Sequence, residues 1–155
     1  MRTSSDVHNY LTERGIAHEM LPLPDECVTA EGAAELLGVP VGDVVKSLLF
    51  VADGAPTIVL VPGDARVGTA RLASALGVAR VTLARAQDVL ATTGYRVGAV
   101  PPCGLAREPP VVADPGVFAP AVVYCGGAAA ATMLKLRSAD LRALLDPLLA
   151  DVADR

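Results

Sequence analysis

The stretch DVVKSLLF, residues 43–50, places one cation, Lys46, inside a run that is otherwise typical of a buried strand. A helix-like segment and a Pro-Val-Gly break precede it, and a second apolar run, TIVLV (57–61), follows the turn DGAP (53–56). Two β-rich runs around such a turn predict a β-hairpin. The residues alone leave two interpretations of Lys46 open. Its stem packs on an edge strand with the ammonium in water, or the ammonium lines a cleft and holds an anionic or carbonyl-bearing substrate.

Helix and strand signals are mixed around this hairpin without strict alternation. Helices are expected after the cap Ser4-Ser5-Asp6, at 30–38 behind the cap Thr29, at 64–77, at 84–94, and at 139–145 behind the cap Ser138, with a further turn from Asp146-Pro147. Strands are expected at 16–21, 80–83, 110–113, 121–127 and 132–136. This pattern predicts one α+β domain over residues 1–155, with a central mixed, largely antiparallel sheet flanked by helices.

Composition and charge narrow the class of protein. Hydrophobic residues make up 52% of the chain and aromatic residues 3%, so the core is expected to consist of Ala, Val and Leu. The net charge of −4 argues against a broad basic surface for DNA, but it allows a local basic rim around one cleft. We see no signal peptide and no apolar run long enough to span a membrane, and therefore expect a cytoplasmic protein.

The side chains most often used in catalysis form no recognisable set. Cys27, Cys103 and Cys125 are widely spaced, with no CxxC and no zinc-type cluster, so we expect a reducing compartment, no metal and no cofactor. His8 lies in the first expected helix and His18 in the first expected strand, and neither is expected to be catalytic. A nucleophilic thiol needs a partner that lowers its pKa, and the sequence shows none close by. Cys103 and Cys125 are therefore expected to fill small apolar spaces, and the two histidines to lie at the surface or at a boundary.

Glycines cluster in the second half of the chain. The segment GYRVGAVPPCGLAREPPVVADPG (94–116) is rich in Gly and Pro, and so long a connection inside a compact domain is often functional. Gly98, Gly104, Gly126 and Gly127 either make turns or bring backbone N–H groups against a ligand. The residues alone do not decide between these roles.

The order of these pieces resembles the YbaK/ProX family of aminoacyl-tRNA deacylases, and also the editing domain inserted in bacterial prolyl-tRNA synthetases. The matching segments are GIAHEMLPLP (15–24), TAEGAAELLGVPVGDVVKSLLF (29–50), LVPGDARVGTARLASALG (60–77), GYRVGAVPPCGL (94–105), VVYCGG (122–127) and LRSADLRALL (136–145). The most specific of them is the helix-break-strand unit that ends in VVKSLLF. The resemblance favours the functional interpretation of Lys46 and implies one α+β domain with a central mixed sheet.

The resemblance also implies roles for individual residues. Lys46 would lie at the mouth of the pocket, near the 3′-terminal adenosine of tRNA, with Ser47 supplying a hydroxyl beside it. Gly98 and Gly126 would supply backbone contacts that stabilise the charge developing on the ester carbonyl, which needs no side-chain nucleophile. The residues expected to complete the substrate site are Val28, Ala99, Pro101, Cys125, Gly127 and Thr132.

Two positions depart from the family pattern. Subgroups that remove Ala carry a His at the position of Cys125, and the subgroup that removes Cys carries Ser there and Asp at the position of Thr132. The amino acid removed therefore does not follow from the resemblance. The few aromatics and an apolar wall of Val28, Leu49, Ala99 and Pro101 favour a small one, with Ala, Ser or Cys as candidates and Pro disfavoured.

The function expected from these observations is trans-acting, metal-independent hydrolysis of mischarged aminoacyl-tRNA. Its partners would be the 3′ end of aminoacyl-tRNA and, because a chain of charge −4 binds tRNA weakly, an aminoacyl-tRNA synthetase. One alternative is a non-catalytic module of the same fold that binds tRNA ends or nucleotides. Another is a cysteine-dependent hydrolase, which requires a reactive Cys103 or Cys125.

Overall fold

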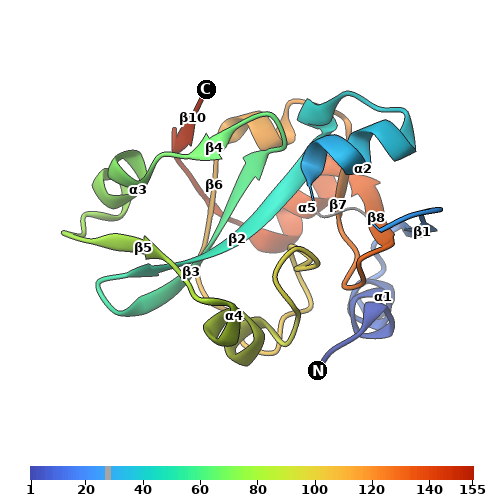
Figure 1. The fold of residues 1–155 in the computed structure, drawn as a ribbon, viewed down its shortest axis with the longest axis horizontal. Coiled ribbons are helices and arrows are strands. Elements are labelled where there is room, and N and C mark those ends of the chain that lie inside the picture. Colours follow the sequence, from blue (N-terminus) through green and yellow to red (C-terminus); the bar gives the residue numbers. More distant parts are fainter. Residues whose placement is uncertain (27–28) are drawn as a thin grey trace.

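The expected hairpin lies at the centre of the fold, in a computed structural model that describes residues 1–26 and 29–155 (Figure 1). Strands β2 (Val44–Ala52) and β3 (Ala55–Pro62) pair antiparallel, with Ala52 opposite Ala55. Asp53 and Gly54 have φ values of 46° and 86°. Positive φ at both central residues is the geometry of a type I′ turn, whose twist matches that of the flanking strands.

A mixed sheet is built outward from this hairpin in the order β1-β8-β7-β2-β3-β6-β9, with β5 also paired to β2. The other strands are β1 (His18–Pro22), β5 (Val81–Leu83), β6 (Val111–Ala113), β7 (Val122–Gly126), β8 (Thr132–Arg137) and β9 (Leu148–Leu149). The β1–β8, β7–β8, β2–β3 and β2–β5 pairs are antiparallel, whereas β2–β7, β3–β6 and β6–β9 are parallel. The expected α+β class with a mixed, largely antiparallel sheet is confirmed.

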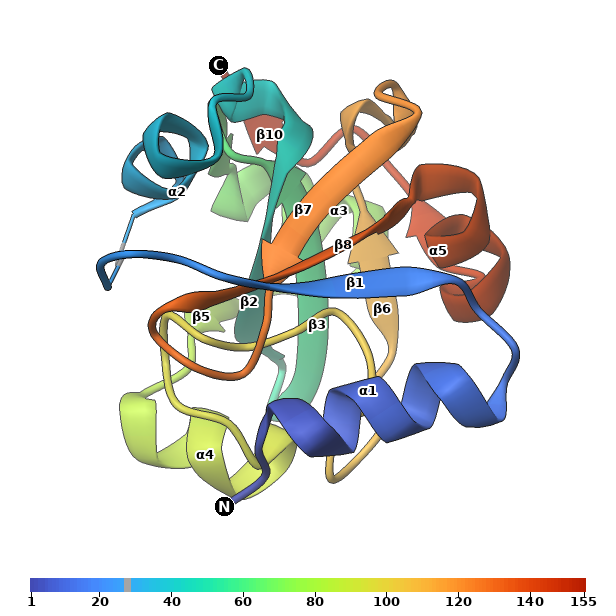
Figure 2. The same cartoon turned by 90° about the vertical axis from the view of Figure 1, so that its right-hand side faces the viewer.

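Five α-helices flank the sheet: α1 (Ser4–Glu13), α2 (Ala30–Leu37), α3 (Thr69–Leu76), α4 (Ala86–Thr93) and α5 (Ser138–Leu145). Helices α1 and α5 lie on the side of β1 and β8 (Figure 2), whereas α2 lies beside β2 and α3 beside β5 (Figure 1). Two short 3-10 helices, η1 (Val41–Asp43) and η2 (Pro115–Phe118), precede β2 and follow β6. Among the described residues, every helix is too short or too polar to cross a bilayer.

Several helix boundaries differ from the expectation. Helix α1 begins one turn early, because its cap is Thr3, whose backbone N–H donates to Asp6 Oδ2 at 2.7 Å. Ser138 is not a cap, since its hydroxyl donates to the Pro120 carbonyl at 2.5 Å and ties α5 to the chain before β7. The turn expected from Asp146 leads instead into strand β9.

The segment 64–77 is helical only in its second half. Residues Arg66–Val67 form strand β4, which pairs with β10 (Ala153–Asp154) at the C-terminal end of the chain. The Gly68 N–H donates to the Val152 carbonyl at 2.7 Å, which holds residue 68 extended, and α3 begins at Thr69. The long-range pairing with residues 153–154 therefore overrides the local helix signal.

Alternation along the hairpin builds a hydrophobic core on both faces of the sheet. Ile58 and Leu60 point into one cluster, with Leu11 of α1 and Leu134 of β8. Val59 and Val61 point into a second cluster on the opposite face, with Leu72 of α3. A strand buried on both faces reads as a continuous apolar run, as TIVLV does. A third cluster joins Ala33 and Ala34 of α2 to Val44 and Met133.

Candidate active site

Strand β2 is paired along its whole length on one edge only. On the β3 edge every residue from Val45 to Ala52 has a partner. On the other edge Val44 and Val45 pair with β7, and residues 50–52 pair with β5. In the described part of the chain, Lys46, Ser47 and Leu48 have no strand beside them on this second edge. A gap in the sheet therefore opens at the residues that stand out in the sequence.

The gap is the floor of a cavity of about 290 Å³, which we call the edge pocket. Its lining comes from the start of α2 (residues 29–31 and 33), from residues 44–48 of β2, and from Gly98, Val100, Gly126 and Met133. Lys46, Ser47, Gly98 and Gly126, which lie far apart in the sequence, are thus brought to one cavity. Val44, Val45, Leu48, Val100 and Met133 give it apolar walls.

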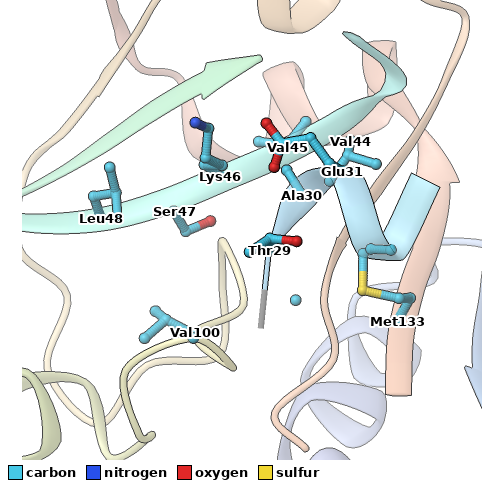
Figure 3. A pocket seen from close by; sticks show the side chains of 13 residues that line it. Thr29, Ala30, Glu31, Val44, Val45, Lys46, Ser47, Leu48, Val100 and Met133 are labelled. Carbon is cyan, nitrogen blue, oxygen red and sulfur yellow. The ribbon is translucent and has the colours of Figure 1, made fainter. Parts of the chain in front are cut away.

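Lys46 and Ser47 leave β2 on opposite faces, because successive side chains alternate along a strand. Figure 3 shows the Lys46 ammonium on the same side of β2 as the Glu31 carboxylate, and the Ser47 hydroxyl on the other side, toward Thr29 and Val100. Lys46 is half-buried and forms no ion pair with any residue that the structure describes. Although β2 is internal to the sheet, Lys46 lies on the part of β2 that has no neighbouring strand on the second edge, and it lines the edge pocket.

The Ser47 hydroxyl is a buried polar atom without a hydrogen-bond partner among the described residues. A buried unpaired hydroxyl costs about 1–3 kcal/mol, so such groups are rare and call for an explanation. Thr29 lies across the pocket, and its Oγ1 accepts from the Gly32 N–H at 3.0 Å, which leaves its own proton available. Two hydroxyl groups able to donate therefore face the edge pocket.

The loop that contains Gly98 and Val100 closes the pocket from the side of β7. Gly98 has a φ of 89°, and a Cβ added to it would meet no atom within 4 Å, so its backbone is bare toward open space. The Gly98 and Val100 N–H groups donate to no carbonyl of the described residues. A Cβ on Gly126 would lie 2.6 Å from the Val100 carbonyl oxygen. The absence of a side chain at Gly126 is what lets the loop lie against β7.

The other expected substrate-binding residues lie around the edge pocket rather than on its surface. Cys125 is fully buried in the core, and Leu49 is buried beside it. Thr132 is half-buried at the start of β8, where its carbonyl accepts from the Gly127 N–H at 3.1 Å. Gly126 follows Cys125 and Met133 follows Thr132 along the chain, and it is Gly126 and Met133 that line the edge pocket.

Three further positions complete the account. Ala99 and Pro101 are buried, and between them Val100 is the residue that faces the edge pocket, whereas Ala99 lines an adjoining hollow. Val28 lies outside the described residues, as does Cys27. The sequence placed the loop correctly at the pocket but could not indicate which of its side chains turns inward.

The remaining cysteines and the histidines are not arranged for catalysis. Burial raises the pKa of the Cys103 thiol to about 12 and also raises that of Cys125, so both stay protonated at neutral pH. His8 and His18 contact each other, with Nδ1 and Nε2 2.9 Å apart, and neither lines the edge pocket. Within the described ranges no three His, Cys, Asp or Glu side chains are grouped as a metal site.

Sequence reasoning missed two polar residues of the pocket. Thr29 was expected only as a helix cap, and it does cap α2. Glu31, in the first turn of α2, supplies a carboxylate to the lining, and no motif in the sequence singles it out. Thr29 and Glu31 lie at the start of the helix-break-strand unit (29–50), the most specific segment of the family resemblance. The helix cap at the start of that unit was the sequence signal that could have pointed to them.

Comparison with known proteins identifies the family. The sequence profile of the aminoacyl-tRNA editing domain matches residues 24–144. The chain is 37% identical over 127 residues to a proline–tRNA ligase of Citrifermentans bemidjiense, covering 78% of this chain and 22% of the ligase. It is 30% identical over 109 residues to the uncharacterized protein YwhH of Bacillus subtilis, covering 70% and 69% of the two chains.

Solved structures agree with this assignment. A candidate trans-editing enzyme for prolyl tRNA synthetase superposes with a TM-score of 0.92 at 27% identity, covering 100% of this chain and 99% of the other. The chain spans only 15% to 22% of the two proline–tRNA ligases of Nitratidesulfovibrio vulgaris (Hildenborough) and Citrifermentans bemidjiense that it matches. The profile match, the full-length structural match and the pocket at the expected strand lead to one conclusion: this chain belongs to the aminoacyl-tRNA editing domain family.

Proposed function

We propose that this chain hydrolyses the ester bond between a small amino acid and the 3′-terminal adenosine of mischarged tRNA, acting in trans. The observation that carries the proposal is that one cavity, in the gap of the sheet, is lined both by the buried Ser47 hydroxyl and by Lys46, neither of which has a side-chain partner among the described residues. A ligand with hydroxyl, carbonyl and phosphate oxygens would satisfy both groups. Membership of the editing family supports an aminoacyl-tRNA end as that ligand.

The proposed chemistry uses water as the nucleophile. Water adds to the ester carbonyl carbon, the tetrahedral intermediate collapses, and the ribose oxygen leaves with a proton, giving free amino acid and tRNA. Negative charge develops on the carbonyl oxygen, and the donors we assign to it are the Gly98 and Val100 N–H groups, which donate to no carbonyl of the described residues. Lys46 holds the phosphate and ribose of the terminal adenosine at the pocket mouth, which orients the ester.

The other residues support this arrangement in different ways. Ser47 donates its proton to the substrate, whereas Gly126 acts by letting the Gly98 loop approach β7. The buried thiols of Cys103 and Cys125 do not support a cysteine-dependent hydrolase. Because aminoacyl-tRNA is made and used in the cytoplasm, we place the protein there. A synthetase that delivers the tRNA would compensate for the chain's net charge of −4.

The size and lining of the edge pocket favour a small amino acid. The cavity of about 290 Å³ must admit the aminoacyl group together with part of the ribose. Its walls near Val100 and Met133 are apolar, and its one cation and one carboxylate, Lys46 and Glu31, balance in charge. Ala, Ser and Cys fit these conditions better than Leu or Lys. A pocket distinguishes two substrates that differ by one methylene group by about 1–3 kcal/mol.

Single-turnover hydrolysis of tRNAs charged with Ala, Ser, Cys, Pro, Leu and Lys tests the proposal. We expect the three small residues to be released fastest, each well above the rate without protein. Fastest release of Leu or Lys would contradict the small pocket. Binding of these tRNAs without any release would instead favour the non-catalytic tRNA-end module. Rates equal to those without protein, together with no binding, would refute both the deacylase and the binding module.

Replacing Ser47 with alanine should separate activity from stability. Removing a buried hydroxyl that has no partner leaves nothing unsatisfied, so the free energy of unfolding should stay the same or rise. Deacylation should fall about 2- to 13-fold, because one hydrogen bond to the substrate, about 0.5–1.5 kcal/mol, is lost. Urea unfolding and single-turnover rates measure the two effects. Loss of stability with unchanged activity would show that the hydroxyl serves the fold instead.

A further inference from the structure

A second hollow adjoins the edge pocket and is larger, with a volume of about 480 Å³. Three segments line it: residues 1–5 before and at the start of α1, residues 96–99, and residues 128–130 between β7 and β8. Gly98 lines both cavities, so they meet at the bare backbone of one residue. Whatever occupies the edge pocket has this hollow as its neighbour.

Hydrogen bonds tie the three walls of the second hollow together. The Ser4 hydroxyl donates to the Gly127 carbonyl at 2.5 Å, and the Ala128 N–H donates to the Ala99 carbonyl at 2.9 Å. The Arg2 N–H donates to the Gly94 carbonyl at 2.8 Å. Ala128 holds a φ of 73°, which a residue with a Cβ adopts only at a cost. The hollow is therefore a fixed feature of the fold, built from parts distant in sequence.

The charge of the second hollow differs from that of the rest of the molecule. Its lining contains two cations, Arg2 and Arg96, and no carboxylate, in a chain of net charge −4. In the edge pocket, by contrast, Lys46 is balanced by Glu31. Arg96 is exposed, and its guanidinium has no hydrogen bond or ion pair within the described chain. The Arg2 guanidinium donates to the Gly104 carbonyl at 3.3 Å, so one of its donors is already used within the chain.

The remaining lining suits a nucleotide base. Val97 is 59% exposed, a large apolar surface for a loop residue, and Ala99, Ala128 and Ala129 are small. Proteins that bind single-stranded RNA combine cations for the phosphates with aromatic side chains or arginine planes on which bases stack. The lining of the second hollow has the cations, and in place of an aromatic ring it has the exposed apolar side chain of Val97.

We propose that the second hollow binds the nucleotide that precedes the terminal adenosine of an RNA 3′ end. Arg96 pairs with the phosphodiester between the last two nucleotides, and the penultimate base packs against Val97. This inference rests on the proposed function, since it takes the terminal aminoacyl-adenosine to lie in the edge pocket. The RNA chain must leave the edge pocket on some side. The second hollow adjoins that pocket, and its lining contains cations and no carboxylate that would repel phosphate.

Two substrates of different length test the proposal. One is a full aminoacyl-tRNA carrying alanine, and the other is 3′-O-alanyl-adenosine, which lacks the penultimate nucleotide. For Arg96→Gln we expect the ratio of kcat/KM on tRNA to kcat/KM on alanyl-adenosine to fall about tenfold, since a charge-assisted contact to phosphate is lost. The matched control is Arg80→Gln, which removes the same charge from an exposed arginine outside both cavities, and should leave the ratio unchanged.

A binding measurement keeps this proposal separate from the catalytic one. The binding of a 5′-fluorescently labelled single-stranded RNA that ends in CCA and carries no amino acid is measured by fluorescence anisotropy at several salt concentrations for each variant. Losing one phosphate contact should reduce the slope of log K against log salt by about 0.7. If the wild type hydrolyses neither substrate, the proposed deacylase function fails, and this slope still decides the RNA site. An Arg96→Gln protein with the slope of wild type and an unchanged ratio would overturn the inference.

Discussion

Lys46→Ala should abolish most deacylation while the protein stays folded. Lys46 lies in the gap of the sheet, half-buried at the edge pocket, and none of the described residues forms an ion pair with it. Its ammonium is thus available to the substrate, and removing it loses both a charge contact and the orientation of the ester. We expect a loss of about 2–4 kcal/mol of transition-state stabilisation, or about 30- to 900-fold in single-turnover rate.

The chain provides a matched control for this variant. Lys135 is the only other lysine, and its ammonium lies 3.8 Å from the exposed Glu19 carboxylate on the β1–β8 pair, outside the edge pocket. Lys135→Ala removes the same charge and should change the rate by less than about twofold, because an exposed ion pair contributes little. Circular dichroism and thermal unfolding establish that both variants fold. A folded Lys46→Ala protein with the wild-type rate would remove Lys46 from the mechanism.

The fold could be predicted where local signals and long-range pairing agree. The DGAP turn between two apolar runs predicted the β2–β3 hairpin, and helix α2 begins after Thr29 and ends before Gly38, as expected. At residues 64–68 they disagree. Arg66 and Val67 pair with residues 153–154, which no local pattern links to them, and the helix starts later than expected. Strand pairing across 86 and 88 positions (Val67 with Ala153, Arg66 with Asp154) is information that a window of neighbouring residues does not contain.

The candidate site was predictable in its parts but not in its surface. The lone cation Lys46, Gly98 and Gly126 reach the edge pocket, whereas Gly104 and Gly127 do not line it. Strand alternation, however, turns Cys125 into the core and leaves Gly126 on the pocket side, and in the loop it is Val100 rather than Ala99 that faces inward. A shift of one residue reverses the face of a strand, so a wall drawn from sequence needs the register that only the sheet provides.

Gly126→Ala, which adds one methyl group, is expected to disrupt the site strongly. Gly126 lies in β7 opposite Met133, and its Cβ would come within 2.6 Å of the Val100 carbonyl oxygen and 3.1 Å of the Val100 carbonyl carbon. Both are backbone atoms, so no side-chain rotation can relieve the contact. The loop must move away from β7, and it carries the Gly98 and Val100 N–H groups that we assign to the ester oxygen.

The displacement has two measurable consequences. Overpacking of this kind costs about 1–3 kcal/mol in free energy of unfolding, and a shift of the loop by about 1 Å should lower the single-turnover rate about 100-fold. Gly77→Ala is the control. Gly77 ends α3 with a φ of 66°, nothing lies within 4 Å of its added Cβ, and it is remote from both cavities. It should lose about 1–2 kcal/mol of stability through backbone strain and keep its rate. Equal rates in folded Gly126→Ala and wild-type protein would mean that the approach of the Val100 loop to β7 does not set the catalytic geometry.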